Sequence, residues 1–298
     1  MKRNNLVVIT GPTGAGKTAA AIRLAQSLNC EIISADSRQI YRHIPIGTAA
    51  PTPQEQSLVK HHFVQFKDLD EYYSASQFEQ DVLALLPRLF ESSHYAILCG
   101  GSMMYVDAVC RGIDDIPSIS DTVRANVLKM FRDNGLDFML EYLKVLDPEY
   151  YGIVDRKNSK RVVHAIEICL QSGATYSSLR TGMAKPRPFN IIKFGINLPR
   201  EQLFNRINQR VDAMIAAGLE QEARAVYHLR HLNSLNTVGY KEMFAYFDGI
   251  MDFHTACERI KKNTRVYAKK QLTWYAKDPS IIWAAPDDDL LQKIGNPD

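Results

Sequence analysis

Short apolar runs alternate along this chain with segments of helical periodicity. The apolar runs have the length and composition of buried strands, and they lie at residues 6–9, 31–35, 95–99 and 191–197. The helical segments carry apolar side chains on one face and lie at residues 18–28, 78–89 and 201–217. Ser74 and Gln77 match a capping box that would begin the second of these helices. Strands that alternate with helices predict an α/β fold with a mostly parallel sheet.

The alternation stops between residues 114 and 188. Short helical patterns follow one another there without an apolar strand between them, and proline and glycine residues interrupt them. This predicts a small all-helical insertion domain that ends in a basic, proline-containing linker at residues 181–188. We therefore expect the core to consist of residues 1–113 and residues 189–298, the second part carrying a basic C-terminal helix.

The junction of the first strand and the first helix has the sequence GPTGAGKT, which fits the phosphate-binding loop (P-loop) pattern. Its residues are Gly11, Pro12, Thr13, Gly14, Ala15, Gly16, Lys17 and Thr18. Glycines let the backbone curl with its N–H groups inward, and the positive N-terminus of the following helix adds to the attraction for anions. We expect the loop to hold a diphosphate, with Lys17 on the outer phosphate and Thr18 on a bridging Mg²⁺.

Polar and glycine residues also follow the second and third predicted strands. Asp36 begins the sequence DSRQIY after the second strand, and Gly100 and Gly101 follow the third. Ligands bind at the carboxyl ends of the strands in open α/β sheets, so both segments should lie near the P-loop. Asp36 is open to three interpretations: a general base, a carboxylate that holds Mg²⁺ through water, or a helix N-cap. The two glycines either allow close backbone approach or form only a tight turn.

Residues 47–66 contain prolines and lack a sustained period, which predicts a long loop over the site. The adjacent His61 and His62 lie in this segment. Neither a nearby cysteine nor a suitably spaced carboxylate completes a metal-ligand set with them. Packing or substrate contact is therefore the favoured role for the two histidines.

Basic residues are concentrated in two places. Residues 156–161 (RKNSKR) lead into a helix at residues 161–170, and a second basic helix spans residues 259–277. In the second helix the cations on one face are Lys261, Arg265 and Lys269, and the interleaved aromatic residues are Tyr267, Trp274 and Tyr275. This combination suits phosphate contact and base stacking in a nucleic acid. The alternative is an amphipathic helix that covers the core.

Composition narrows the class of protein. The chain has 298 residues, of which 46% are hydrophobic and 23% charged, typical of a globular protein of about two domains. No apolar run approaches the roughly 18 residues that span a bilayer, and residues 1–5 lead directly into a strand instead of forming a signal peptide. We therefore expect a cytoplasmic protein without membrane contact. Its 5 scattered cysteines suggest neither a disulfide framework nor a zinc site, and a net charge of +3 indicates no partner.

The motifs taken together resemble those of the tRNA dimethylallyltransferases over nearly the whole chain. They comprise residues 11–18, 36–41, 100–105, 146–148, 161–167, 238–242 and 264–274. The resemblance implies a P-loop NTPase-like core interrupted by the helical insertion. It also implies transfer of a dimethylallyl group from dimethylallyl diphosphate to N6 of the adenosine on the 3′ side of the anticodon, with Mg²⁺ and release of diphosphate.

The resemblance also assigns roles to individual residues. Asp36 would be the catalytic base, Thr18 the Mg²⁺ ligand, and Arg265 with Lys17 would neutralise the departing diphosphate. The residues expected to contact tRNA are Asp36, Ser37, Arg38, Gln39, Ser102, Arg124, Lys160, Arg161, His164, Lys269, Lys270, Gln271, Trp274 and Tyr275. The expected partners are the anticodon stem-loop of tRNA and dimethylallyl diphosphate, acting on a monomeric enzyme.

Three other functions compete with this one. A nucleotide or small-metabolite kinase would bind ATP on the same loop, but adenylate-kinase-type enzymes carry an Asp-Gly-x-Pro-Arg stretch that this sequence lacks. A prenyltransferase that acts on free AMP would need neither the insertion nor the basic aromatic helix. A non-catalytic RNA-binding protein switched by nucleotide would not need Asp36 beside the P-loop.

Overall fold

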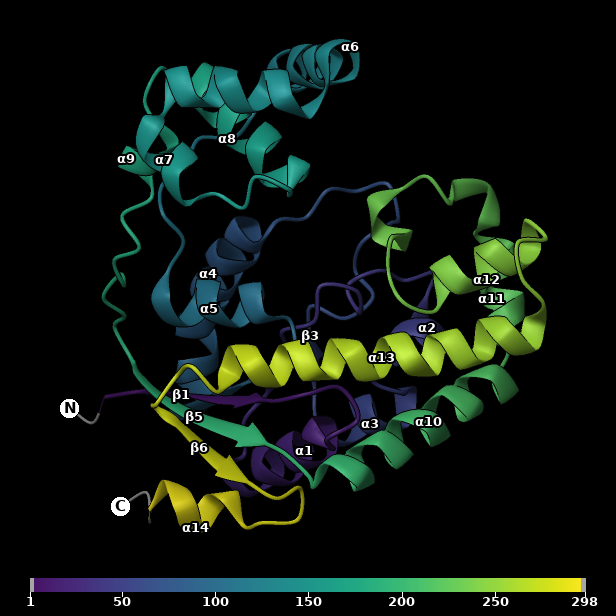
Figure 1. Cartoon of the computed structure of the whole chain (residues 1–298). Helices are drawn as coiled ribbons and strands as arrows, with labels where there is room; N and C mark the ends of the chain where they lie inside the picture. The colour runs from purple at the N-terminus through teal and green to yellow at the C-terminus, as the bar shows by residue number, and fades with distance from the viewer. Residues whose placement is uncertain (1–2, 296–298) are drawn as a thin grey trace. The chain divides into compact units, whose positions relative to one another are not determined.

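The computed structural model describes residues 3–295 (Figure 1). Met1 and Lys2, part of the segment expected to lead directly into the first strand, lie outside the described residues, as do residues 296–298. The chain divides into two compact units. The first unit combines the residues up to Cys110 with those from Arg187 onward, and the second spans Arg111–Pro186.

A parallel sheet forms the centre of the first unit. Its strands are β1 (Asn5–Thr10), β2 (Ile32–Ser34), β3 (His61–His62), β4 (Tyr95–Cys99), β5 (Asn190–Ile196) and β6 (Ile281–Ala284). They lie in the order β3-β2-β4-β1-β5-β6, and every neighbouring pair is parallel. The prediction of an α/β core with a mostly parallel sheet is confirmed. Because all strands run the same way, the carboxyl ends of β1, β2 and β4 meet at one edge of the sheet.

Helices cover both faces of this sheet, and the side chains of β1 pack alternately against the helices on one face and on the other. Leu6 and Val8 pack into one cluster with α4 (Ala75–Ser92) and α5 (Met103–Arg111). Val7 and Ile9 pack into another cluster with α1 (Lys17–Leu28) and α10 (Arg200–Ala216). Alternate side chains of a strand point to opposite faces, so a strand buried on both sides is a continuous apolar run. The predicted capping box of Ser74 and Gln77 is present at the start of α4.

Residues 47–66 are not the uninterrupted loop that the sequence predicted. They contain the second half of α2 (Pro45–Thr48), all of α3 (Pro53–Leu58) and the short edge strand β3 (His61–His62). A capping box between Thr52 and Glu55 begins α3, and elements this short cannot show a sustained period. Both histidines of β3 make polar contacts with neighbouring residues. His62 pairs with Glu31, and His61 Nδ1 lies 2.8 Å from the carbonyl oxygen of Val59.

The rest of the first unit is helical. Its elements are α11 (Leu219–Ala225), η1 (Tyr227–Leu229), η2 (Asn233–Leu235), α12 (Tyr240–Phe247), α13 (Phe253–Tyr275) and α14 (Leu290–Ile294). The hydroxyl of the buried Tyr240 donates to Glu222, whose carboxylate accepts the backbone N–H groups of Ile46 and Gly47, each at 2.8 Å. These bonds attach α2 to α11 and α12. In Figure 1, α13 runs beside α10 along much of its length.

The second unit is all-helical and has its own core. It consists of α6 (Asp121–Leu146), α7 (Pro148–Ile153), α8 (Ser159–Ser172) and α9 (Tyr176–Leu179). Its buried residues include Val127, Met139, Leu143, Val162 and Ile166. Asp147 is fully buried, where it accepts the backbone N–H of Tyr150 at 2.9 Å and that of Ser177 at 2.7 Å. One carboxylate thus joins α7 to α9. No helix within residues 3–295 is long and apolar enough to cross a membrane.

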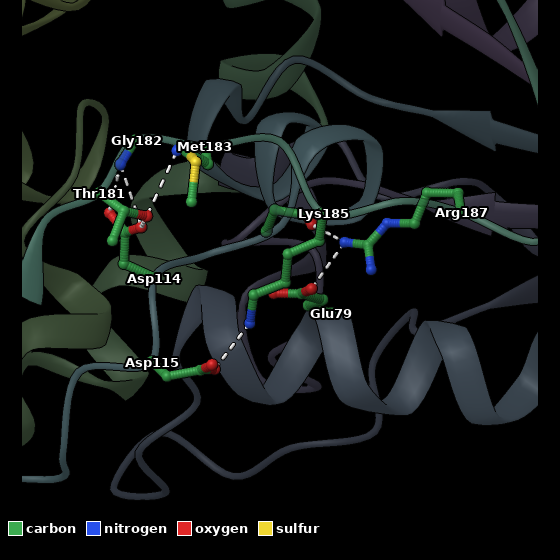
Figure 2. Close-up of polar contacts among 9 residues, drawn as sticks. Glu79, Asp114, Asp115, Thr181, Gly182, Met183, Lys185 and Arg187 are labelled. Carbon is green, nitrogen blue, oxygen red and sulfur yellow. Dashed lines mark hydrogen bonds and ion pairs between the residues drawn. The ribbon is translucent and has the colours of Figure 1, made fainter.

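The basic linker uses its cations in local contacts (Figure 2). Within the second unit, Asp114 accepts the hydroxyl of Thr181 at 2.6 Å, and Lys185 Nζ lies 2.6 Å from an oxygen of Asp115. Within the first unit, the guanidinium of Arg187 makes a buried ion pair with Glu79 at 2.6 Å. The segment is therefore held by a hydrogen bond at Thr181 and by ion pairs at Lys185 and Arg187, each with the unit to which the residue belongs.

Candidate active site

The P-loop lies between β1 and α1 at the carboxyl edge of the sheet. Gly11 has a φ of 132°, and a Cβ there would lie 2.2 Å from the carbonyl oxygen of Ile196, so only glycine fits. The loop is also held from the opposite end of the chain. The amide of Gln271 accepts the N–H of Thr13 at 2.8 Å and donates to the carbonyl oxygen of Gly101 at 2.8 Å. Gln271 thus joins the P-loop to the turn that follows β4.

Lys17 lies inside the cavity that the P-loop forms. Its Nζ donates to the carbonyl oxygen of Pro12 at 2.8 Å. Burial lowers the pKa of the Lys17 ammonium to about 8. A bound phosphate would supply the negative charge that this buried cation lacks, and would raise its pKa again. Thr18 follows at the start of α1 and lines the same cavity.

Helix α10 contributes cations that the sequence did not reveal. Arg206 and Arg210 line the cavity with the P-loop, and Arg210 Nη1 lies 3.4 Å from the hydroxyl oxygen of Thr13. Burial lowers the pKa of Arg210, and the charge of Asp36 partly offsets this. The i, i+4 spacing of these arginines on one helix face was the available signal. Nothing in the sequence places that face beside a loop almost 200 residues away in the chain.

Arg265 does not occupy the position expected for it. Its guanidinium contacts the side-chain oxygen of Asn208 on α10, and it is not among the described residues that line the cavities of the site. The structure therefore corrects the source of the cations that surround the P-loop. They come from Lys17 and from the arginines of α10.

The cavity around the P-loop, here called the P-loop cavity, has a volume of about 490 Å³. A second cavity of about 340 Å³, here called the Ser102 cavity, adjoins it. The polar residues that line the Ser102 cavity include Ser37, Arg38 and Ser102. Its apolar lining residues include Ile207, Val211, Met214, Leu219 and Ile260. The residues that line both cavities are Thr13, Asp36, Arg210 and Tyr267.

Asp36 uses one of its carboxylate oxygens structurally. Oδ1 accepts the backbone N–H groups of Arg38 at 2.9 Å and Gln39 at 3.3 Å, which closes a turn at residues 37–40. Oδ2 has no hydrogen-bond partner within residues 3–295. The capping interaction is therefore present, although it closes a turn and not a helix. It leaves the second oxygen available as a base or as a metal ligand.

Several neighbours of Asp36 hold the surrounding loops. Ser102 is buried, and its hydroxyl oxygen accepts the backbone N–H of Ser37 at 2.8 Å. Gln39 donates its side-chain amide to the carbonyl oxygen of Ala49 at 2.9 Å. A Cβ on Gly100 would lie 2.1 Å from the carbonyl oxygen of Ala35, so close backbone approach is the reason for this glycine. The loop after β2 and the turn after β4 are thus locked together.

The cationic face of α13 packs on α10. Lys261 pairs with Asp212 at 2.7 Å, Arg265 contacts Asn208, and Lys269 Nζ lies 5.5 Å from the ring centroid of Phe204. The expectation that this stripe faces a nucleic acid is therefore wrong for its paired members. An amphipathic helix that covers the core describes this face better.

Other residues of α13 separate into buried and exposed groups. Gln271 and Tyr275 are both 2% exposed, so neither presents a side chain to a nucleic acid surface. Lys269 and Lys270 are exposed, and so is Trp274, whose indole N–H donates to Asp107 at 2.9 Å. Only these three keep the accessibility that a tRNA contact requires among the α13 residues named for that role.

The remaining residues expected to contact tRNA lie in the second unit. Lys160, Arg161 and His164 are exposed on α8, and Arg124 is half-buried on α6. His164 Nδ1 lies 3.5 Å from the carboxylate of Glu167 one turn further along α8. The second unit thus presents basic side chains on both α6 and α8.

The fold and the site together define a protein that handles a diphosphate or triphosphate group: a P-loop on a parallel sheet, cations around one cavity and a carboxylate at its border with another. Comparisons with known proteins specify the class further. A family model described as IPP transferase matches residues 39–278. The tRNA dimethylallyltransferase 1 of Phocaeicola vulgatus is 52% identical over 293 residues, which cover 98% of each chain. The tRNA dimethylallyltransferase 2 of Parabacteroides distasonis is 53% identical over 285 residues, 96% of this chain and 95% of the relative.

Solved structures agree with these relatives. The full-length tRNA isopentenylpyrophosphate transferase from Bacillus halodurans superposes with a TM-score of 0.71 at 34% identity, covering 98% of this chain and 93% of that one. A eukaryotic dimethylallyltransferase acting on tRNA gives a TM-score of 0.83 at 26% identity, covering 99% of this chain and 76% of that one. The chain therefore belongs to the tRNA dimethylallyltransferase family, and it is a prenyltransferase. The family resemblance of its motifs is confirmed.

Proposed function

We propose that the protein transfers a dimethylallyl group from dimethylallyl diphosphate to N6 of the adenosine on the 3′ side of the anticodon, and releases diphosphate. The observation that carries this proposal is the junction of the two cavities at Asp36. The P-loop cavity adjoins a second cavity there, and the free oxygen Oδ2 belongs to Asp36, one of the four residues that line both. Such an arrangement suits a donor bound on one side and an acceptor on the other.

The donor's diphosphate belongs in the P-loop cavity. Inward N–H groups of the loop, the ammonium of Lys17 and the guanidinium groups of Arg206 and Arg210 would absorb its charge. An allylic diphosphate leaves more readily as more of that charge is neutralised. These groups would therefore bind the donor and also stabilise the leaving group.

Mg²⁺ fits this site as a partner of the donor. No group of three or more His, Cys, Asp or Glu residues within residues 3–295 forms a metal site of its own. Mg²⁺ typically keeps several waters and combines one or two protein oxygens with substrate phosphates. The Thr18 hydroxyl would be such a ligand, with Asp36 reaching the ion through water. When bound, the ion supplies further positive charge to the diphosphate.

The acceptor amine would approach from the Ser102 cavity. An exocyclic adenine amine is a poor nucleophile because its lone pair is delocalised into the ring. Asp36 Oδ2 would accept the N6 proton as the new C–N bond forms. The adenosine must leave its stack to reach this cavity, where the polar residues Ser37, Arg38 and Ser102 would receive the flipped base.

The RNA around that adenosine would contact exposed cations and an aromatic residue. We assign this role to Lys269, Lys270 and Trp274 on α13 and to Arg124, Lys160, Arg161 and His164 in the second unit. Gln39 and Gln271 are positioning residues in this proposal, because their amides hold the loops of the site.

A transfer assay tests the function. The protein is incubated with radiolabelled dimethylallyl diphosphate, Mg²⁺ and an anticodon stem-loop bearing A next to the anticodon. We expect label in this RNA, and none in a matched stem-loop with G at that position or in free AMP. Transfer to AMP at equal efficiency would contradict a tRNA acceptor. Phosphoryl transfer from ATP without prenyl transfer would favour the kinase.

A further inference from the structure

Tyr267 is the aromatic residue that both cavities share. Of the described residues that line either cavity, no other is aromatic. Thr264, Tyr267 and Gln271 lie at helical spacing on the side of α13 that faces the site, whereas Lys261 and Arg265 contact α10. The ring therefore lies, with Thr13, Asp36 and Arg210, at the border between the P-loop cavity and the Ser102 cavity.

The Tyr267 side chain makes no polar contact that holds the fold of the described residues together. Tyr267 is 37% exposed, and its hydroxyl makes no hydrogen bond within residues 3–295. Burial and the charge of Asp36 raise the pKa of Tyr267 to about 12, so the phenol is neutral near pH 7. The side chain is thus neither a base nor an anion under working conditions. What it offers the site is a neutral aromatic face.

The proposed function, on which this inference rests, creates a positive charge at this place. The bond between C1 of the dimethylallyl group and the diphosphate oxygen breaks, and its electron pair leaves with the diphosphate. The N6 lone pair forms the new bond to C1, and the N6 proton goes to Asp36. While the old bond breaks, positive charge spreads over the allyl carbons between the two cavities.

We infer that the Tyr267 ring is a catalytic residue that stabilises this developing allyl cation with its π face. An aromatic face attracts a cation through its quadrupole. Unlike a carboxylate or a water molecule, it presents no lone pair that would capture the cation before the amine does. The charge of Asp36 stabilises the cation as well, but that carboxylate is occupied with the N6 proton.

Graded substitution of the ring tests this role. Single-turnover transfer is measured for Tyr267→Phe, Tyr267→Leu and variants carrying phenylalanine with one, two or three ring fluorines. Fluorine withdraws electron density from the face with little change of shape. We expect Phe to keep the rate and Leu to lose roughly 2- to 30-fold. The logarithm of the rate should fall stepwise with each fluorine, while donor and stem-loop affinities stay within about twofold.

Other results would overturn the inference. Equal rates for Phe and its fluorinated forms would show that the electron density of the face is irrelevant. A change confined to stem-loop affinity would make Tyr267 a stacking platform for the acceptor base. A Phe variant as slow as Leu would transfer the role to the hydroxyl.

The donor provides an independent measurement. A dimethylallyl diphosphate with one fluorinated methyl group should react more slowly with the wild-type protein, since fluorine destabilises the allyl cation. If that donor reacts at the normal rate, the transition state is not cationic and the inference fails. If the wild-type protein transfers no prenyl group at all, the proposed function fails instead, so the two failures are distinguishable.

Discussion

The two cavities of the site are built in different ways. The P-loop cavity is built around one short segment, since Thr13, Gly14, Gly16, Lys17 and Thr18 all line it, and α10 adds Arg206 and Arg210. The Ser102 cavity is assembled from the loop after β2, the turn after β4 and the helices α10, α11 and α13. Its polar side chains already hold loops together, as Ser102 does for Ser37. A contiguous loop thus supplies the base of the anion site, to which α10 adds two arginines, whereas the acceptor site is assembled throughout from distant segments.

Asp36 lies at the border between the two cavities. We therefore predict that its replacement lowers the rate of prenyl transfer more than it lowers the affinity for donor or RNA. Asp36→Asn keeps the oxygen that closes the turn but removes the carboxylate that accepts the N6 proton. We expect single-turnover transfer to fall about 10²- to 10⁴-fold, with donor and RNA affinities kept within a few-fold.

Titrating Mg²⁺ against the single-turnover rate of Asp36→Asn separates the two roles left open for this carboxylate. A lost base is not replaced by metal. Recovery to near wild-type speed at high Mg²⁺ would sink the general-base assignment and leave Asp36 as a metal ligand.

The next effect concerns which arginine serves the P-loop cavity. Arg210→Gln removes a charge-assisted partner of the diphosphate, typically worth about 1.5–3 kcal/mol, so donor affinity should fall roughly 10- to 150-fold. Arg265→Gln is the matched control on the neighbouring helix and should change donor affinity less than about threefold. Isothermal titration with dimethylallyl diphosphate measures both. The reverse order would return the diphosphate contact to Arg265.

The pH dependence of donor binding should come from Lys17. Burial lowers its pKa to about 8 in the free protein, and a bound diphosphate raises it, so binding takes up a proton. Affinity is then full below pH 8 and falls as pH rises through it, by about tenfold between pH 7 and pH 9. Donor titrations at saturating Mg²⁺ test this, with Lys17→Met as control. A Lys17→Met variant with the same slope would assign the titration to another group.

The smallest expected effect is on RNA binding at the surface of α13. Replacing both Lys269 and Lys270 with Ala should flatten the dependence of log affinity on log salt by about 0.7–0.9 for each lost phosphate contact. Lys261→Gln is the control, because this lysine is paired with Asp212 and Glu258. Filter binding of the stem-loop across salt concentrations gives the slopes. An unchanged slope in the double variant would show that this face is only solvated.

Local patterns in the sequence determined a large part of this protein's secondary structure and the position of its P-loop. The buried strands, the capping box of α4 and the P-loop are properties of consecutive residues, because apolar period and glycine placement act within a few positions. Asp36 was located at the edge of the site for the same reason: it lies two residues after the end of a buried strand. Matching motifs along the chain then indicated the family.

Tertiary structure alone decided how side chains from distant segments share the site. Helix α13 carries polar residues on several faces, and periodicity does not state which face meets α10 and which meets the cavities. Packing directed Lys261 and Arg265 to α10, buried Gln271 against the P-loop and placed Tyr267 between the cavities. Arg210 meets Thr13 across 197 positions of sequence. Such contacts arise from the folding of whole layers onto one another, so no local pattern contains them.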